Sequence, residues 1–178
     1  DAADNIYIGG AFNDTVDFDP DGSNVANLVA AGSDDAFVWK LDKSGGYINA
    51  VAWGGNGEDE CMGLAVDDTN VYASGSFFGN ATFVDIGLTA ITDGGFVLKM
   101  DTSLNIIWAN DLAGPDSMAY ADVYDIAVKN EYICLVGEFG DSVDVDPGSN
   151  EVWIVSDDTT GPSGFVLLFD TTGAINWV

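Results

Sequence analysis

One six-residue phrase, Phe37-Val38-Trp39-Lys40-Leu41-Asp42, occurs three times in the chain. It returns as Phe96-Val97-Leu98-Lys99-Met100-Asp101 and as Phe165-Val166-Leu167-Leu168-Phe169-Asp170. Large apolar side chains alternate along each copy with other residues, which is the period of a β-strand with one richer buried face. Each copy ends at an aspartate that opens a small turn.

A second phrase precedes each copy and sets the length of the repeat. A tyrosine is followed by a glycine and a phenylalanine in Tyr7–Phe12, Tyr72–Phe77 and Tyr132–Phe139, and the last glycines of these phrases lie 65 and then 62 residues apart. A period of this length predicts stacked or radially arranged units. We place the repeats at residues 1–55, 56–112 and 113–178, with the first and the last incomplete.

The middle repeat shows the strand pattern of one unit. Gly63–Asp67 and Val71–Phe77 read as one hairpin, and Phe96–Met100 and Ile106–Asn110 read as another. No stretch of useful length has a helical period. The sequence therefore predicts an all-β, propeller-like array of about three four-stranded antiparallel blades.

The composition describes a folded and strongly acidic protein. Of its 178 residues 47% are hydrophobic and 12% aromatic, which excludes a disordered polyanion. Thirty acidic residues stand against four lysines, with no arginine or histidine, for a net charge of -26. Such a surface repels phosphate backbones and anionic lipids, so we expect neither nucleic-acid binding nor membrane insertion. The acids either keep the protein soluble in a salty exterior or bind divalent cations.

The repeats resemble a known family. An Ala-Val strand, the tyrosine-centred strand, the element Val16-Asp17-Phe18-Asp19-Pro20 and the Phe-Val-x-Lys-Leu-Asp phrase together resemble the bacterial SBBP β-propeller repeats, over nearly the whole chain. This resemblance implies a propeller within a large secreted or cell-surface protein and no particular reaction. The turn Asp170-Thr171-Thr172-Gly173 with Trp177 also resembles the docking turn of quinoprotein-like propellers, over one hairpin.

Three blades are too few to close a ring, because propellers have roughly four to eight. The remaining blades must come from the parent chain or from copies of the protein itself. Self-assembly into a ring or fibre is therefore one expectation, and an extracellular or cell-surface location is another.

Two loops carry acids at alternate positions, as the opening of a calcium loop does. The twelfth position of the first loop is Leu28 where a bidentate acid is expected, so it is not an EF-hand. Each loop is either a Ca2+ site or a plain acidic turn. The candidate ligands are Asp17, Asp19 and Asp21 in the first loop, and Asp144, Asp146 and Asn150 in the second.

The residue types argue against catalysis. Without histidine or arginine the chain lacks the commonest general base and the usual phosphate clamp. Thirty acids always place some carboxylate pair at a plausible distance, so such a pair is uninformative. We expect no enzyme activity and no organic cofactor.

Glycan attachment and glycan binding are two further hypotheses. N-glycosylation patterns begin at Asn13 and Asn80, and triplets that resemble the O-glycosylation signal of Bacteroidota mark five hydroxyls. These are Thr15, Ser117, Ser142, Thr159 and Thr171. Trp153, in a variable stretch, is the tryptophan we expect to be exposed for stacking on sugars.

Three functions follow from these patterns. The first is a non-catalytic structural and interaction module. The alternative is a lectin-like glycan-binding or adhesin propeller, and the third is a segment of a quinoprotein-type enzyme. Cys61 and Cys134 form one disulfide or remain separate thiols, and their spacing suggests no zinc site.

Overall fold

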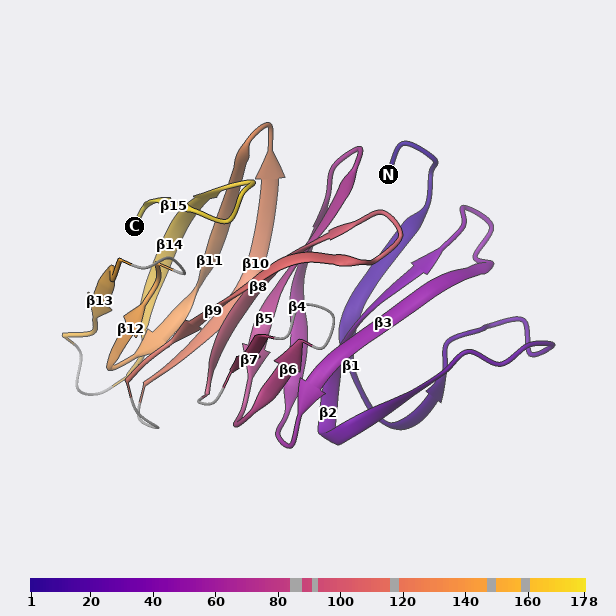
Figure 1. The fold of residues 1–178 in the computed structure, drawn as a ribbon, viewed down its shortest axis with the longest axis horizontal. Helices are drawn as coiled ribbons and strands as arrows, with labels where there is room; N and C mark the ends of the chain where they lie inside the picture. Colours follow the sequence, from indigo (N-terminus) through magenta and orange to yellow (C-terminus); the bar gives the residue numbers. More distant parts are fainter. Residues whose placement is uncertain (84–87, 91–92, 116–118, 147–149, 158–160) are drawn as a thin grey trace.

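The computed structural model of the chain describes residues 1–83, 88–90, 93–115, 119–146, 150–157 and 161–178 (Figure 1). These residues form antiparallel strands and turns without a helix, which confirms the all-β class. Accordingly, the described part of the chain contains no helix long and apolar enough to span a membrane.

Three sheets follow one another along the molecule (Figure 1). The first has the order β1-β2-β3-β6-β7, with β1 Ile6–Asp17, β2 Asn27–Leu41, β3 Tyr47–Gly55, β6 Ala81–Phe83 and β7 Leu88–Ala90. The second has the order β13-β12-β9-β8-β5-β4, with β4 Asp59–Val66, β5 Asn70–Phe77, β8 Gly94–Asp101, β9 Ile106–Ala113, β12 Ser142–Asp144 and β13 Trp153–Val155. The third has the order β10-β11-β14-β15, with β10 Tyr120–Lys129, β11 Tyr132–Gly140, β14 Ser163–Asp170 and β15 Ile175–Trp177.

The repeated phrases form the central strands of three equivalent units. We call β1–β3 unit 1, then β4, β5, β8 and β9 unit 2, and β10, β11, β14 and β15 unit 3. The six-residue phrase is the end of β2, β8 and β14, and its phenylalanine pairs with the repeat glycine in each unit. A Cβ on Gly10 or Gly75 would lie 3.0 Å from that phenylalanine ring. The glycine recurs because the ring lies over it.

Hairpins are exchanged between neighbouring units. The β6–β7 hairpin belongs in sequence to unit 2 but pairs with β3, where Gly54 faces Thr82 and Gly55 faces Ala81. The β12–β13 hairpin likewise leaves unit 3 and pairs with β9. In unit 1 the equivalent segment stays on its own strands, with Thr15 facing Val29. Sheets therefore do not coincide with sequence repeats.

A left-handed residue redirects the chain at the start of both exchanged hairpins and of the equivalent segment of unit 1. Asp14, Gly79 and Asp141 have φ angles of 57°, 77° and 58°. These three residues each lie two positions after the repeat phenylalanine. A positive φ is costly for most residues and least so for Gly, Asn and Asp, which explains the residue types found there.

The core lies between the units. One cluster joins units 1 and 2 and contains Trp53 and Phe96, whose rings meet edge to face at 5.5 Å. Another joins units 2 and 3 and contains Val97 and Phe165. A small cluster on the outer side of unit 1 gathers Phe12 and Phe18. Most of the burial that stabilises the fold is therefore shared between successive units.

Candidate inter-unit docking site

The same turn follows the repeated phrase in all three units. The carboxylate of Asp101 accepts hydrogen bonds from the amides of Ser103 at 2.8 Å and Asn105 at 3.0 Å. Asp42 and Asp170 make the corresponding bonds in their own units. The fourth residue of each turn is left-handed, with φ angles of 85°, 69° and 92° at Gly45, Leu104 and Gly173. We call these segments, Asp42–Gly46, Asp101–Asn105 and Asp170–Ala174, the aspartate turns.

The aspartate turn of unit 2 docks on unit 1. Lys40 Nζ donates to the carbonyl oxygen of Thr102. The Tyr7 hydroxyl lies 3.3 Å from the same oxygen and donates its proton to Asp1 Oδ2 at 2.7 Å. Asn49 Nδ2 donates to the carbonyl of Ser103 at 2.9 Å. Backbone carbonyls that a turn leaves unpaired are thus satisfied by the preceding unit.

The aspartate turn of unit 3 docks on unit 2 in the same way. Lys99 Nζ donates to the Thr171 carbonyl at 3.1 Å, and Trp108 Nε1 donates to the same oxygen at 3.4 Å. Asn110 Nδ2 donates to the carbonyl of Gly173 at 3.0 Å. The strand register places Lys99 at the position of Lys40, and Trp108 at the position of Asn49. The docking site is therefore a repeated device.

Each docking lysine also lies over an aromatic ring. Lys40 Nζ is 5.3 Å from the ring centre of Tyr7, and Lys99 Nζ is 5.5 Å from that of Tyr72. Burial lowers the pKa of Lys40, and the charge of Asp101 partly opposes this. Burial, together with the charge of Asp67, raises the pKa of Tyr72. These lysines were not among the sequence candidates, although two of only four lysines stand at the same place in the repeated phrase.

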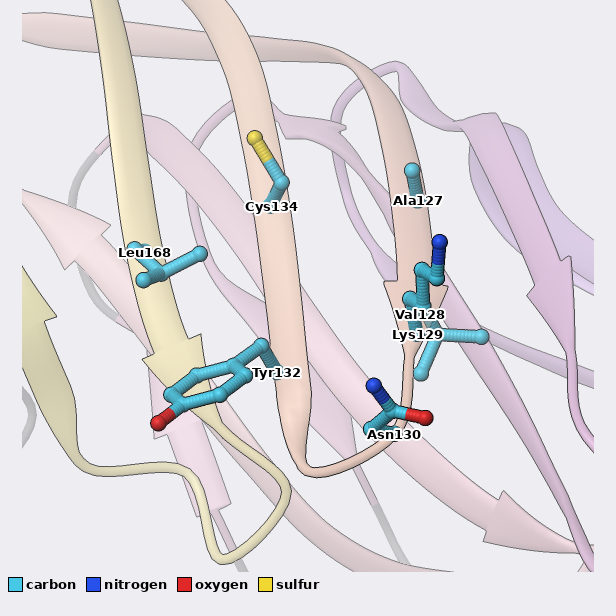
Figure 2. Close-up of a pocket in the computed structure, with 7 residues that line it drawn as sticks. All are labelled: Ala127, Val128, Lys129, Asn130, Tyr132, Cys134 and Leu168. Atoms are coloured by element: carbon cyan, nitrogen blue, oxygen red, sulfur yellow. The ribbon is translucent and has the colours of Figure 1, made fainter.

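Unit 3 has a different set of side chains at the docking position. Cys134 and Leu168 pair there as Tyr7 pairs with Lys40, and Trp177 takes the place of Trp108. Cys134 and Leu168 line an apolar cavity of about 310 Å³ on β10, β11 and β14, which Figure 2 shows. The sequence phrases aligned Tyr132 with the other two tyrosines, but the register puts Tyr132 two residues earlier.

The face around this cavity is more exposed in unit 3 than the equivalent faces of the other units. Val166 is 46% exposed, whereas Val38 and Val97, at the same position, are fully buried under the next unit. Tyr132, Val136 and Trp177 are exposed as well. We define Tyr132, Cys134, Val136, Val166, Leu168 and Trp177 as the rear end face.

Unit 1 exposes the opposite face. Ile8 is 38% exposed, while Ala73 and Leu135, at the equivalent positions, are fully buried against the preceding unit. Ile6 is 45% exposed, and its counterparts in β5 and β11 are also fully buried. Phe18 packs over Phe37 and Trp39 on this side. We define the front end face by five residues, of which two are exposed, two are half-buried and one is buried: Ile6 and Ile8, Phe37 and Trp39, and Leu41.

The candidate calcium loops use their acids to hold their own backbone. Asp17 accepts from the amides of Asp19 and Ala26 at 3.0 and 2.8 Å, and Asp19 accepts from the amide of Asp21. Hydrogen bonds from the backbone and side chain of Ser23 lower the pKa of Asp21. Each of these three carboxylates therefore accepts a hydrogen bond from the backbone amide two residues further along the loop.

The second loop repeats this arrangement. Asp144 accepts from the amides of Asp146 and Val152 at 3.0 and 2.9 Å, and Asn150 is exposed. No group of three or more His, Cys, Asp or Glu residues in the described part of the chain could hold a metal. Calcium binding at these loops stays a prediction.

Two buried carboxylates lie together where units 1 and 2 meet. A Cβ on Gly54 would be 2.7 Å from an oxygen of both Asp35 and Asp59. The amide of Gly55 donates to Asp59 Oδ2 at 2.8 Å, while Oδ1 has no hydrogen-bond partner among the described atoms. Burial raises the pKa of Asp59 to about 6, and the charge of Asp35 adds to this effect.

The glycan candidates differ in accessibility. Asn13, Thr15 and Asn80 are exposed, whereas Ser142 and Thr171 are half-buried. Ser117 and Thr159 lie outside the described residues. Trp153 is exposed, with Nε1 donating to Glu151 at 3.0 Å. The described candidates are spread over β1, the segments of the two exchanged hairpins and the aspartate turn of unit 3.

The two cysteines are separate thiols. Cys61 is buried and Cys134 is half-buried in the rear end face. Burial raises the pKa of Cys61, which makes it a poor nucleophile. Of the two alternatives left by the sequence, the structure has the reduced pair.

No family model matches the chain, and no curated protein matches it in sequence.

Proposed function

We propose that this chain is a non-catalytic structural and interaction module, whose propeller-like units continue an array beyond its two end faces. The observation that carries the proposal is the rear end face. At its centre Val166 is exposed, whereas Val38 and Val97 at the same position of units 1 and 2 are fully buried under the next unit. Contiguous apolar surface of this kind marks an interaction site in a folded protein.

The two internal interfaces support this proposal. Each joins a rear face to a front face, with an aspartate turn seated beside β-strands of the preceding unit. Repeat proteins derive much of their stability from such nearest-neighbour contacts. A further unit placed on unit 3 would bury Val166 and Trp177 as Val97 and Trp108 are covered now.

The proposal also includes a location for the protein and a role without catalysis. The resemblance to SBBP repeats and the net charge of -26 favour a secreted or cell-surface bacterial protein. Absence of histidine and arginine from the sequence favours a role without catalysis. Copies of the protein or further blades of a parent chain are the partners proposed for the end faces.

A four-unit chain tests the proposal. In the strand register Trp177 and Val178 correspond to Trp108 and Ala109. A second copy of residues 110–178 is therefore appended after Val178, so that the repeat continues without a shift. We expect one cooperative unfolding transition at higher urea than for the present chain. A thiol reagent should find one reactive cysteine in each folded chain, because the added unit covers the original Cys134 and exposes its own copy.

The same fusion carrying Val166→Glu is the control, since a charge at the junction should uncouple the added unit. Two separate transitions and two reactive thiols in the unmodified fusion would contradict the proposal.

A further inference from the structure

The chain carries one rear end face and one front end face that no other unit covers; on the front end face Ile6 and Ile8 are exposed, and Phe18 of the same unit covers Phe37 and Trp39. The rear end face of unit 3 corresponds to the surfaces of units 1 and 2 on which aspartate turns dock, and the front end face of unit 1 corresponds to the surfaces that units 2 and 3 bury. Each copy therefore offers one surface that receives an aspartate turn and one surface that carries such a turn. Such a pair of unlike surfaces is the requirement for a heterologous, head-to-tail interface.

The aspartate turn of unit 1, Asp42–Gly46, already has the geometry of the two docked turns. Asp42 accepts from the amides of Ser44 and Gly46 at 2.7 and 2.9 Å, and Gly45 is left-handed like Leu104 and Gly173. Ser44 is exposed. The segment needs no rearrangement to dock, so the ordering cost of association is small.

We infer that the rear end face of one copy binds the front end face of a second copy, with the Asp42–Gly46 turn seated at the cavity beside Trp177. This inference rests on the proposed function and names its partner. The Trp177 indole would donate to the carbonyl of Lys43, as Trp108 donates to that of Thr171.

The chemistry of this contact differs from that of the internal ones. Leu168 and Cys134 replace the lysine and tyrosine, so the contact would depend on apolar burial and on the indole. Two copies at -26 each repel one another, which salt screens. We therefore expect association to strengthen with added sodium chloride.

A mixing experiment tests the inference by sedimentation velocity in high salt. Val166→Glu breaks the rear end face and leaves the front one intact, and Ile8→Glu does the reverse. Each variant alone should be monomeric across a wide range of protein concentration, and an equal mixture should form dimers. Ile107→Glu, at an exposed position on β9, is the matched control and should associate as the unmodified chain does.

A gain-of-function variant tests where the Asp42–Gly46 turn docks. Leu168→Lys restores the lysine present in units 1 and 2, and should make the complex about tenfold tighter by donating to the Lys43 carbonyl. Unchanged or weaker association would overturn the placement of the turn. Circular dichroism checks that every variant is folded.

Two outcomes would overturn the head-to-tail pairing. Association of Ile8→Glu alone, with loss in Val166→Glu, would mean that two rear faces meet. Monomers for every chain at every concentration would mean that a second copy is not the partner. Docking of the added unit in the four-unit fusion would still uphold the proposed function in that case.

Discussion

Lys99 shows how one residue couples two units, because its ammonium contacts the ring of Tyr72 and a carbonyl of the next unit. Lys99→Met keeps most of the apolar stem but removes both interactions. We expect a loss of about 1–2 kcal/mol in the free energy of unfolding. Urea denaturation measures it. Lys43→Met, at an exposed lysine, is the control, and an equal loss in both variants would contradict a role in docking.

The raised pKa of Asp59 predicts an unusual dependence of folding stability on pH. Its pKa is raised from 3.8 to about 6 in the folded state, so folding favours the protonated form. Between these two values the unfolded chain releases this proton while the folded chain retains it. The contribution is therefore fully present below about pH 4 and is lost as pH rises through about 6.

Asp59→Asn should remove this dependence, since the amide imitates the protonated acid. From pH 4 to pH 7 the unmodified protein should lose on the order of 2 kcal/mol more stability than the variant. Urea denaturation at a series of pH values gives the comparison, with the exposed Asp68→Asn as control. Parallel curves for the Asp59 variant and the unmodified protein would refute the prediction.

At the scale of the elements, the exchanged β6–β7 hairpin depends on the lack of a side chain at Gly55. A Cβ there would lie 1.4 Å from the carbonyl oxygen of Asn80, so Gly55→Ala must push β6 away from β3. We expect a loss of at least 2 kcal/mol in the free energy of unfolding. Faster amide exchange at Ala81 and Thr82 should accompany it.

Gly161→Ala provides the control for this element, because a Cβ at Gly161 meets nothing within 4 Å and its φ is not positive. It should leave stability within about 0.5 kcal/mol of the unmodified protein. Normal exchange of β6 in Gly55→Ala would show that the hairpin is held in some other way.

For the whole molecule, the charge of -26 opposes folding through self-repulsion. Sodium chloride should therefore raise the melting temperature by several degrees.

A calcium site at the acidic loops predicts a further rise in the melting temperature in calcium chloride at equal ionic strength, which EDTA should reverse. Asp17→Asn combined with Asp144→Asn should abolish only the calcium-specific part. Equal effects of both salts would leave the loops as hydrogen-bonded turns.

The sequence determined the all-β class and the repeat, because strand alternation and turn aspartates are local properties that need no partner. Asp14 and Asp141 stand at the same position relative to the repeat glycine in the sequence, and the structure gives them φ angles of 57° and 58°. The acidic loops were found in the same way, but their hydrogen bonds to Ala26 and Val152 depend on how each loop closes.

Only the tertiary structure decided which residues meet across units. Lys99 and Thr171 are far apart in the chain, and no local pattern states that one donates to the other. The match of Tyr132 with Tyr7 and Tyr72 was wrong for the same reason: strand register is set by pairing, which puts Cys134 opposite Leu168. The end faces are likewise a tertiary property, because Val38, Val97 and Val166 read alike in sequence and differ only in whether a neighbouring unit covers them.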